Sequence, residues 1–316
     1  MYKEENGMIQ IENLVKRYGN LVALDHLNLE IREGEIFGLL GPNGSGKTTA
    51  INCMLALLKF DKGTIRIFGE NMSPDQYKIK QQIGIVLQNV AVFEELTVYE
   101  NIDYFCGLYI KERGRRRELV EEALRFVGLE EYRKMRPKKL SGGLLRRLNI
   151  ACGIAHRPRL IIMDEPTVAV DPQSRNKILE GIKELNRQGA TIIYTSHYME
   201  EVEQICTRIA ILDHGRTIAA GTKEELKAMI KIGEKIMVEA AALDERQLQK
   251  IRNLPFIFEV RYEKQILSVR CIKGKNNLSR LLDLLQGEEV SFGRVYSELP
   301  TLNDVFLELT GKQLRD

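Results

Sequence analysis

The sequence predicts an α/β fold with a mixed, mainly parallel sheet, followed by a smaller α+β domain. A strand-like run at residues 35–40 leads into a glycine-rich loop and then into a helix-like stretch at 49–58. Short apolar runs at 160–163 and 190–194 have the length of strands buried on both faces, and the segment between them has helical spacing. Beyond residue 233, shorter strand and helix candidates alternate, which predicts a separate domain.

Residues 1–232 are expected to form the larger domain. Its pattern turns helical from residue 97 to about 155, and Thr97 and Glu100 have the spacing of a capping box at the start. We therefore expect a helical subdomain at about 89–157. Further strands are predicted at 8–14, 27–31, 64–68, 83–87, 208–212 and 216–220, with a turn at 17–20 and helices at 172–188 and from about 223.

Residues 233–316 are expected to form the small α+β domain, because they carry short elements and no catalytic constellation. The residues at 300–309 have the pattern of a capped amphipathic helix. The other candidates are strands at 235–240, 256–262, 266–271 and 290–296, and helices at 244–253 and 276–286.

The composition of the chain limits which kinds of partner and metal site it is expected to have. The net charge of +3 is too small to favour nucleic acid, and five scattered cysteines without a C-x-x-C pair favour reduced thiols over disulfides or a zinc site. No apolar run approaches the ~18 residues that cross a bilayer, and residues 1–10 do not resemble a secretory signal. Any work at a membrane would then require a partner protein. Basic clusters at 111–117 and 133–139 fit a solvated surface, with contact to anionic lipid as the alternative.

The glycine-rich loop has the spacing G-x-x-x-x-G-K-[ST] between a strand and a helix. Glycines let successive backbone N–H groups point at phosphate oxygens, and the helix N-terminus adds partial positive charge. Lys47 can reach the β- and γ-phosphates, while the Thr48 hydroxyl can ligate Mg²⁺. The predicted ATP-binding residues here are Gly41, Pro42, Asn43, Gly44, Ser45, Gly46, Lys47, Thr48 and Thr49.

Two carboxylates follow the apolar run at 160–163. In parallel sheets ligands bind at the carboxyl ends of strands, so Asp164 and Glu165 are placed for catalysis. We expect Asp164 in the magnesium shell beside Thr48, and Glu165 beside a water aimed at the γ-phosphate. A second candidate for anion binding is Ser141 with Gly142 and Gly143, which precede a helix-like segment.

Over residues 8–228 the chain resembles the ATP-binding subunits of ABC transporters. The loop at 41–49 resembles Walker A, the residues at 140–143 match the signature motif, and those at 160–165 resemble Walker B. The resemblance assigns Gln88 to the Q-loop, which contacts magnesium and couples to a membrane subunit. It also identifies Asp171 as the D-loop aspartate, His197 as the switch histidine and Tyr18 as the aromatic that stacks on adenine.

The resemblance implies a head-to-tail dimer with a second copy or a paralogous ATPase, in which Ser141 of one subunit faces the nucleotide of the other. It also implies an integral membrane permease as partner, and a location at the cytoplasmic face of a bacterial membrane. Two departures affect the details of hydrolysis: Leu144 replaces the usual glutamine after the signature glycines, and Ala169-Val170 replaces the usual Gly-Leu before Asp171.

The C-terminal run at 299–311, with Leu314-Arg315-Asp316, is similar to the tails of daunorubicin- and linearmycin-type exporter ATPases. The expected function is therefore ATP hydrolysis that drives export of a drug, antibiotic or lipid-like substrate. Alternatives are an importer ATPase with a regulatory C-terminal domain, a soluble nucleotide-switch ATPase, and a protein that binds ATP without hydrolysing it. The remaining histidines, His26, His156 and His214, are expected to be structural or surface residues.

Overall fold

The computed structural model describes residues 7–274 and 276–311. The chain divides into two compact units between Thr222 and Lys223, and the tail residues 314–316 lie outside the described part. The sequence placed this boundary later, after residue 232. The difference arises because helix α8 (Lys223–Met229) belongs to the second unit, where the Ala228 carbonyl accepts a hydrogen bond from Lys273.

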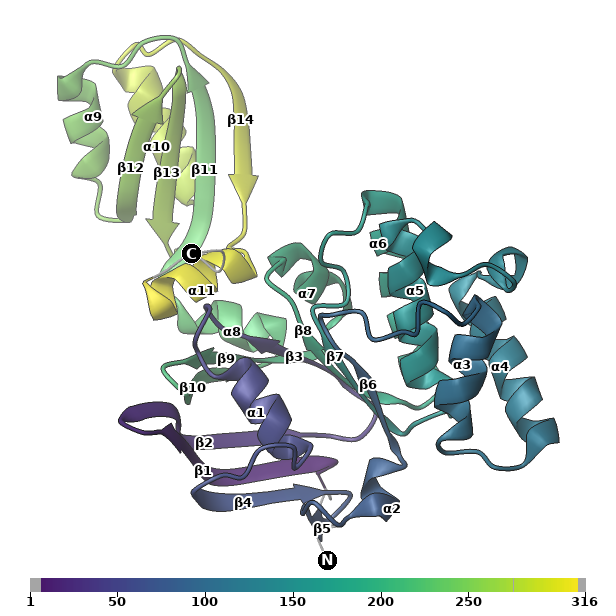
Figure 1. The fold of residues 1–316 in the computed structure, drawn as a ribbon. Helices are drawn as coiled ribbons and strands as arrows, with labels where there is room; N and C mark the ends of the chain where they lie inside the picture. The colour runs from purple at the N-terminus through teal and green to yellow at the C-terminus, as the bar shows by residue number, and fades with distance from the viewer. Residues whose placement is uncertain (1–6, 275, 312–316) are drawn as a thin grey trace, which may run out of the picture. The chain divides into compact units, whose positions relative to one another are not determined.

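A six-stranded sheet forms the centre of the first unit (Figure 1). Its strand order is β10-β9-β3-β8-β7-β6, and every pair is parallel except β9 with β10. The inner strands are continuous apolar runs, as burial on both faces requires. The strands are β3 (Ile36–Leu40), β6 (Ile83–Val86), β7 (Leu160–Asp164), β8 (Thr191–Thr195), β9 (Arg208–Asp213) and β10 (Arg216–Gly221).

A second, antiparallel sheet has the strand order β2-β1-β4-β5. This sheet, helix α1 (Lys47–Met54) and the central sheet contribute side chains to one shared apolar core. The turn predicted at 17–20 is shorter in the structure, because β1 continues to Tyr18 and leaves only Gly19 and Asn20 in the turn. The strands are β1 (Ile9–Tyr18), β2 (Leu21–Ile31), β4 (Lys62–Ile67) and β5 (Glu70–Asn71).

The helices of the first unit lie mainly between β6 and β7 in the chain. The capping box predicted at Thr97 and Glu100 is confirmed at the start of α3. Helix α7, which follows β8, had no counterpart in the sequence analysis. The helices are α2 (Tyr77–Lys80), α3 (Val98–Gly107), α4 (Arg113–Val127), α5 (Gly142–Ile154), α6 (Pro172–Arg187) and α7 (Met199–Ile205), with 3₁₀ turns η1 (Glu130–Tyr132) and η2 (Pro137–Lys139).

Several members of the two basic clusters form ion pairs within this helical part. Arg116 pairs with Asp103 at 2.8 Å, and Arg133 pairs with Glu121 at 2.7 Å. Such local pairing is typical of a solvated helix surface. In the described part of the chain, every helix is too short or too polar to span a bilayer.

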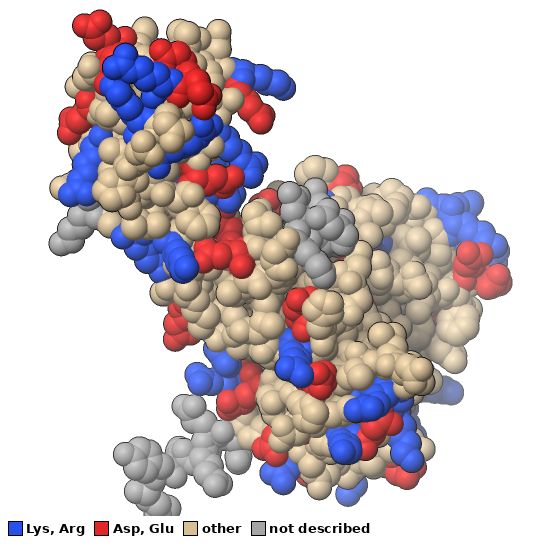
Figure 2. Space-filling model, turned by 90° about the vertical axis from the view of Figure 1, so that its left-hand side faces the viewer, with Lys and Arg blue, Asp and Glu red and all other residues tan. Residues whose placement is uncertain are grey.

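The second unit has the β-α-β-β-α-β order of a ferredoxin-like fold. Its antiparallel sheet runs β12-β13-β11-β14, and helices α9 and α10 cover one face through a purely apolar core (Figure 1). On the face seen in Figure 2, acidic and basic side chains of this unit alternate. The elements are β11 (Ile232–Ala240), α9 (Glu245–Arg252), β12 (Ile257–Glu263), β13 (Ile266–Ile272), α10 (Asn277–Gly287), β14 (Phe292–Glu298) and α11 (Leu302–Thr310).

Candidate functional site

The glycine-rich loop connects β3 to α1, as the sequence predicted. Gly44 and Gly46 have φ angles of 79° and 103°, which only glycine adopts easily. A Cβ atom on Gly46 would also lie 2.7 Å from the Ala23 carbonyl oxygen. The loop therefore needs glycine for its backbone shape and for its close contact with β2.

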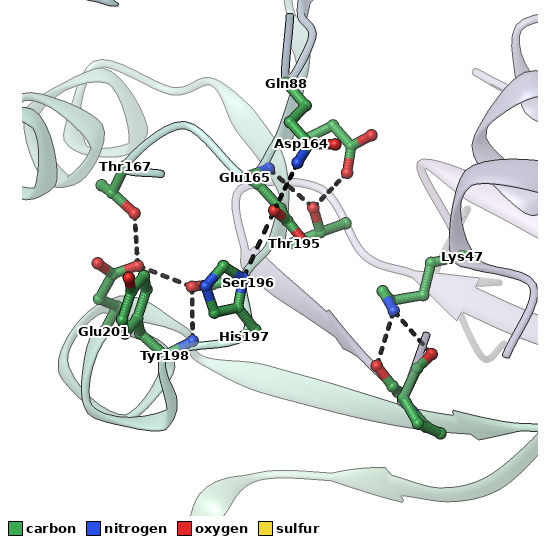
Figure 3. A network of polar contacts seen from close by, with 12 residues as sticks. Lys47, Gln88, Asp164, Glu165, Thr167, Thr195, Ser196, His197, Tyr198 and Glu201 are labelled. Atoms are coloured by element: carbon green, nitrogen blue, oxygen red, sulfur yellow. Dashed lines mark hydrogen bonds and ion pairs between the residues drawn. The ribbon is translucent and has the colours of Figure 1, made fainter. Parts of the chain in front are cut away.

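The Lys47 side chain folds back over the loop and donates hydrogen bonds to the carbonyl oxygens of Gly41 at 2.7 Å and Pro42 at 3.1 Å (Figure 3). Burial lowers the pKa of Lys47, while the nearby Glu165 and Asp164 carboxylates act in the opposite direction. A phosphate group would supply the negative charge that this partly desolvated ammonium group lacks.

The loop lines a cavity of about 750 Å³. Residues far apart in the sequence meet in it, since the carboxyl ends of the parallel strands β3, β6, β7 and β8 lie at one edge of the sheet. Of the predicted site residues, the cavity is lined by Tyr18, Asn43, Gly44, Gly46, Lys47, Thr48, Thr49, Gln88, Asp164, Glu165 and His197.

Two exposed rings line the cavity, one predicted at the ATP site and one not. Tyr18 is 48% exposed, as expected of a side chain left open to stack on a ligand. His214, expected to be a structural or surface residue, is highly exposed and also lines the cavity.

Two predicted catalytic side chains converge on a carboxylate oxygen of a third, Glu165. Gln88 donates its Nε2 hydrogen to Glu165 Oε2 at 3.1 Å, and His197 Nδ1 lies 3.5 Å from the same atom (Figure 3). Glu165 has a φ of 48°, an unusual backbone conformation for this residue type that occurs at functional sites. The structure thus joins the ends of β6, β7 and β8 at the Glu165 side chain.

Thr195 at the end of β8 organises the two carboxylates. Its hydroxyl donates to Asp164 Oδ1 at 2.6 Å and accepts a hydrogen bond from the Glu165 backbone N–H at 2.9 Å. One hydroxyl therefore holds the Asp164 carboxylate and the Glu165 backbone together. The sequence analysis did not identify Thr195.

The residues predicted to hold magnesium have the right donor chemistry. Thr48 and Asp164 both line the cavity and offer a hydroxyl and a carboxylate oxygen, which are ligands that Mg²⁺ prefers. Among the described residues, no group of three or more His, Cys, Asp or Glu side chains could hold a metal by itself. An ion here would accordingly share its coordination sphere with nucleotide phosphates. Gln88, also predicted as a ligand, donates an Nε2 hydrogen to Glu165, while its amide oxygen is the atom that would bind a metal.

Ser141, Gly142, Gly143 and Asp171 do not line the cavity. Ser141 caps α5 by accepting a hydrogen bond from the Leu144 N–H, and Asp171 caps α6 by accepting one from the Ser174 N–H at 2.9 Å. Bonding to Ser174 lowers the pKa of Asp171. A Cβ atom on Gly143 would lie 2.5 Å from Ser174 Oγ, so the two caps pack directly against each other. The predicted second anion site is therefore a separate surface of the same unit.

Arg146 on α5 is a further residue that sequence reasoning missed. It is 3% exposed, and its guanidinium donates to five backbone carbonyl oxygens, which belong to Leu87, Gln88, Asp164, Glu165 and Pro166. Burial lowers its pKa, and the Asp164 charge opposes that shift. One buried cation thereby fixes the backbone of Gln88 relative to that of Glu165. The sequence pattern does not single out Arg146, because Arg147 follows it directly in the same helix.

Comparison with known proteins places these motifs in context. The family described as ABC transporter matches residues 24–168. The chain is 39% identical over 311 residues to the linearmycin resistance ATP-binding protein LnrL of Bacillus subtilis, covering 98% of this chain and 100% of that protein. It is 34% identical to the daunorubicin resistance ATP-binding protein DrrA3 of Streptomyces coeruleorubidus, with 97% of each chain covered.

Solved structures resemble the chain as well. An ATP-binding cassette solved as a dimer in a post-hydrolysis state, bound to ADP and Pi, has a TM-score of 0.62 and 29% identity, covering 68% of this chain and 98% of that one. The structure of cbiO1 from Clostridium perfringens, part of an ABC transporter complex, has a TM-score of 0.66 and 26% identity, with 79% and 96% covered.

Proposed function

The chain belongs to the ATP-binding subunits of ABC transporters, and from this premise we propose that it powers export of a drug-, antibiotic- or lipid-like substrate through a separate membrane permease. The family and the P-loop NTPase fold predicted from the sequence are confirmed, and the chain is an ABC ATPase that binds ATP. The convergence of Gln88 and His197 on Glu165, next to the phosphate loop, supports ATP hydrolysis. The similarity to linearmycin and daunorubicin resistance ATP-binding proteins supports export.

Each polar group then has a chemical role. Lys47 and the backbone N–H groups of the phosphate loop bind the β- and γ-phosphates. Thr48 and Asp164 would hold Mg²⁺, which neutralises charge on the phosphates. Glu165 accepts a proton from the water that attacks the γ-phosphorus as the bond to the β-phosphate oxygen breaks. His197 lies beside that carboxylate and orients it.

The separation of the cavity from the signature residues supports a dimer. Ser141 and Asp171 lie together on another surface of the first unit. In a head-to-tail dimer, that surface of one copy would close over the nucleotide of the other and supply the N-terminus of α5 to its phosphates. We propose a partner that is a second copy or a paralogous ATPase.

An apolar surface beside Gln88 supports a membrane partner. Leu87, Val90 and Phe93 are each about 40% exposed, and the Phe93 ring packs against the exposed Tyr104 ring at 4.9 Å. A partner helix seated there would contact the residues next to Gln88, which itself contacts Glu165. We propose that the permease senses nucleotide state through this surface, at the cytoplasmic face of the membrane.

Site-specific crosslinking tests this coupling. All five native cysteines are buried, so a cysteine introduced at Val90 can be modified selectively. We expect Val90→Cys to crosslink to the partner permease in a nucleotide-dependent way, whereas the exposed control Leu57→Cys, just beyond the C-terminal end of α1, should not. Absence of any nucleotide-dependent crosslink would refute the coupling surface.

An antibiotic-susceptibility assay distinguishes export from the alternative functions. Cells lacking this gene should become more sensitive to amphiphilic antibiotics, and the wild-type gene should restore resistance while Glu165→Gln should not. Loss of uptake of a nutrient would favour an importer with a regulatory C-terminal domain. Purification without any membrane protein would favour a soluble nucleotide switch.

A further inference from the structure

A buried carboxylate on α7 lies outside the cavity and has no role in the mechanism above. Glu201 is 3% exposed, and its Oε2 atom accepts hydrogen bonds from three hydroxyl groups. Figure 3 shows those from Thr167 and Ser196. The donors are Tyr194 at 2.6 Å, Thr167 at 2.8 Å and Ser196 at 2.8 Å. The other oxygen, Oε1, lies 3.3 Å from Arg175 Nε.

These partners belong to two segments that both lead to the site. Thr167 and Arg175 bracket the stretch that contains Asp171, and Thr167 follows Glu165 by two residues. Tyr194 and Ser196 lie immediately before His197, and the Ser196 hydroxyl also accepts a hydrogen bond from the Tyr198 N–H at 3.0 Å. Glu201 is therefore a shared acceptor between the Asp171 segment and the His197 segment.

The chemistry of the contacts requires a carboxylate. Every partner is a hydroxyl donor or a cation, and an ionised carboxylate only accepts hydrogen bonds. Glutamine would keep one acceptor oxygen but would place an N–H₂ group among the same donors. It would also remove the negative charge that faces Arg175, whose guanidinium lies 4.4 Å from the centre of the Tyr198 ring. The Oε2 atom is hydrogen-bonded by all three hydroxyl groups, whereas Oε1 and Arg175 Nε form an ion pair without a hydrogen bond. The rigidity of the network therefore depends on the hydroxyl contacts to Oε2 and on the charge of the carboxylate.

We propose that Glu201 is a positioning residue that holds the Asp171 segment in register with His197. In the dimer of the proposed function, on which this inference rests, the Asp171 surface contacts the partner copy. Closure of the partner on that surface would then reach His197 and Glu165 through Thr167, Glu201 and Ser196. Buried ion pairs also occur without any functional role, so the experiment must separate positioning from stability.

The test is Glu201→Gln in the full-length chain, with Glu35→Gln as a matched control. Glu35 is also buried, at 7% exposure, and is also paired with an arginine, since Arg208 lies 3.1 Å away. It precedes β3 at the end of that strand opposite the phosphate loop. Both variants should lower the melting temperature, because each leaves a partly buried arginine without its charge partner.

Steady-state ATPase kinetics give the discriminating result. Displacement of a catalytic group by about 1 Å costs up to about 100-fold in rate, so we expect the kcat of Glu201→Gln to fall about 10- to 100-fold. Its KM for Mg-ATP should stay within about twofold of wild type, because Lys47, Thr48 and Tyr18 are untouched. Glu35→Gln should keep a wild-type kcat per folded molecule.

Milder variants keep the proposal testable if Glu201→Gln does not fold. Thr167→Val and Ser196→Ala each remove one of the three hydroxyl donors, and each should lower kcat with little change in KM. A kcat loss in all three variants no larger than that of Glu35→Gln would overturn the proposal. Failure of the proposed export function is a separate outcome. In that case deletion of the gene would leave antibiotic sensitivity unchanged, while the difference in kcat between Glu201→Gln and Glu35→Gln would remain.

Discussion

The interiors of the two units differ in their polar content. Among the described residues, the first unit buries the side chains of Glu35, Ser45, Asn101, Arg146, Asn149, His156, Asp164, Thr167, Thr191, Thr195, Ser196 and Glu201, whereas the second buries only Asn277 from the same polar and charged classes. Burial of a polar group costs free energy unless it is hydrogen-bonded. Asp164 lines the cavity, and Arg146 and Thr195 contact residues that line it, so the first unit maintains part of this cost where the chemistry takes place.

Positive backbone φ angles occur in both units but at different kinds of position. In the first unit, Glu165 and Ala169 have positive φ angles within the segment between the two carboxylates and Asp171. In the second unit, Lys264 and Gln265 have positive φ angles in the turn between β12 and β13. Strain at a hairpin turn is ordinary, while strain next to a catalytic carboxylate is typical of a functional site. The comparison favours catalysis in the first unit, and we predict an accessory role for the second.

The largest effect is expected from Glu165→Gln. The change keeps the size of the side chain but removes the base, which is typically worth about 10²–10⁴-fold in rate, or roughly 3–5 kcal/mol. ATP should still bind, and loss of the negative charge near the γ-phosphate should favour an ATP-filled dimer. Steady-state hydrolysis and size-exclusion chromatography with and without ATP measure both outcomes.

The matched control for that experiment is Asp164→Asn. It should weaken Mg-ATP binding itself, since it perturbs the predicted metal shell. Near-normal turnover by Glu165→Gln would mean that another group activates the water, and the polar interior of the first unit would then need a different explanation.

A smaller effect, on the stability of the folded chain, is expected when the pH is lowered. Burial lowers the pKa of His156 from 6.5 to about 4. As pH falls below about 6.5, His156 of the unfolded chain becomes protonated, whereas His156 of the folded chain stays neutral down to about pH 4. The stability that neutral His156 contributes is therefore present above pH ~6.5 and is lost as pH falls to about 4. The free energy of unfolding should decrease by up to about 3 kcal/mol over this range. Urea unfolding of the first unit at several pH values should show this slope.

The variant His156→Phe should flatten that slope, because phenylalanine cannot be protonated but can keep the ring stacked on Tyr109, whose centroid lies 3.9 Å away. The exposed His214→Gln is the control and should retain the slope. All four histidines precede residue 223, so no histidine contributes such a slope in the second unit. An unchanged slope in His156→Phe would contradict the assignment.

The smallest effect on nucleotide binding is expected from removal of the second unit. The cavity is lined by residues between Tyr18 and His214, so a chain ending at Thr222 should bind Mg-ATP within about twofold of the full-length protein, as expected for distant sites. Assembly with the permease, or transport, should weaken. Isothermal titration and co-purification measure the two properties, and loss of ATP binding by a folded truncated chain would contradict the accessory role.

A core variant of the full-length chain provides the complementary control. Leu267 on β13 is fully buried in the apolar core of the second unit. Leu267→Ala should destabilise that unit by about 2–5 kcal/mol, as is usual for such a cavity, and should leave kcat unchanged.

The sequence by itself determined the contiguous features of this protein. The phosphate loop, the buried strand that ends at Asp164 and Glu165, and the capping box at Thr97 are each encoded within about ten neighbouring residues, where side-chain periodicity and glycine placement act locally. The strands and helices of the second unit were predictable for the same reason. The boundary of the second unit was not predictable in this way, because Gly233, the glycine that suggested a break in the chain, lies inside β11.

Only the tertiary structure decided which groups meet. The strand order places the ends of β6, β7 and β8 side by side, and this brings Gln88, Glu165 and His197 to one carboxylate oxygen. Arg146 and Glu201 gained their roles in the same way, since each binds segments distant from its own helix. Their partners are backbone carbonyls and hydroxyl groups, which no residue pattern specifies. A buried charge selects such partners by geometry and desolvation, and both exist only once the chain has folded.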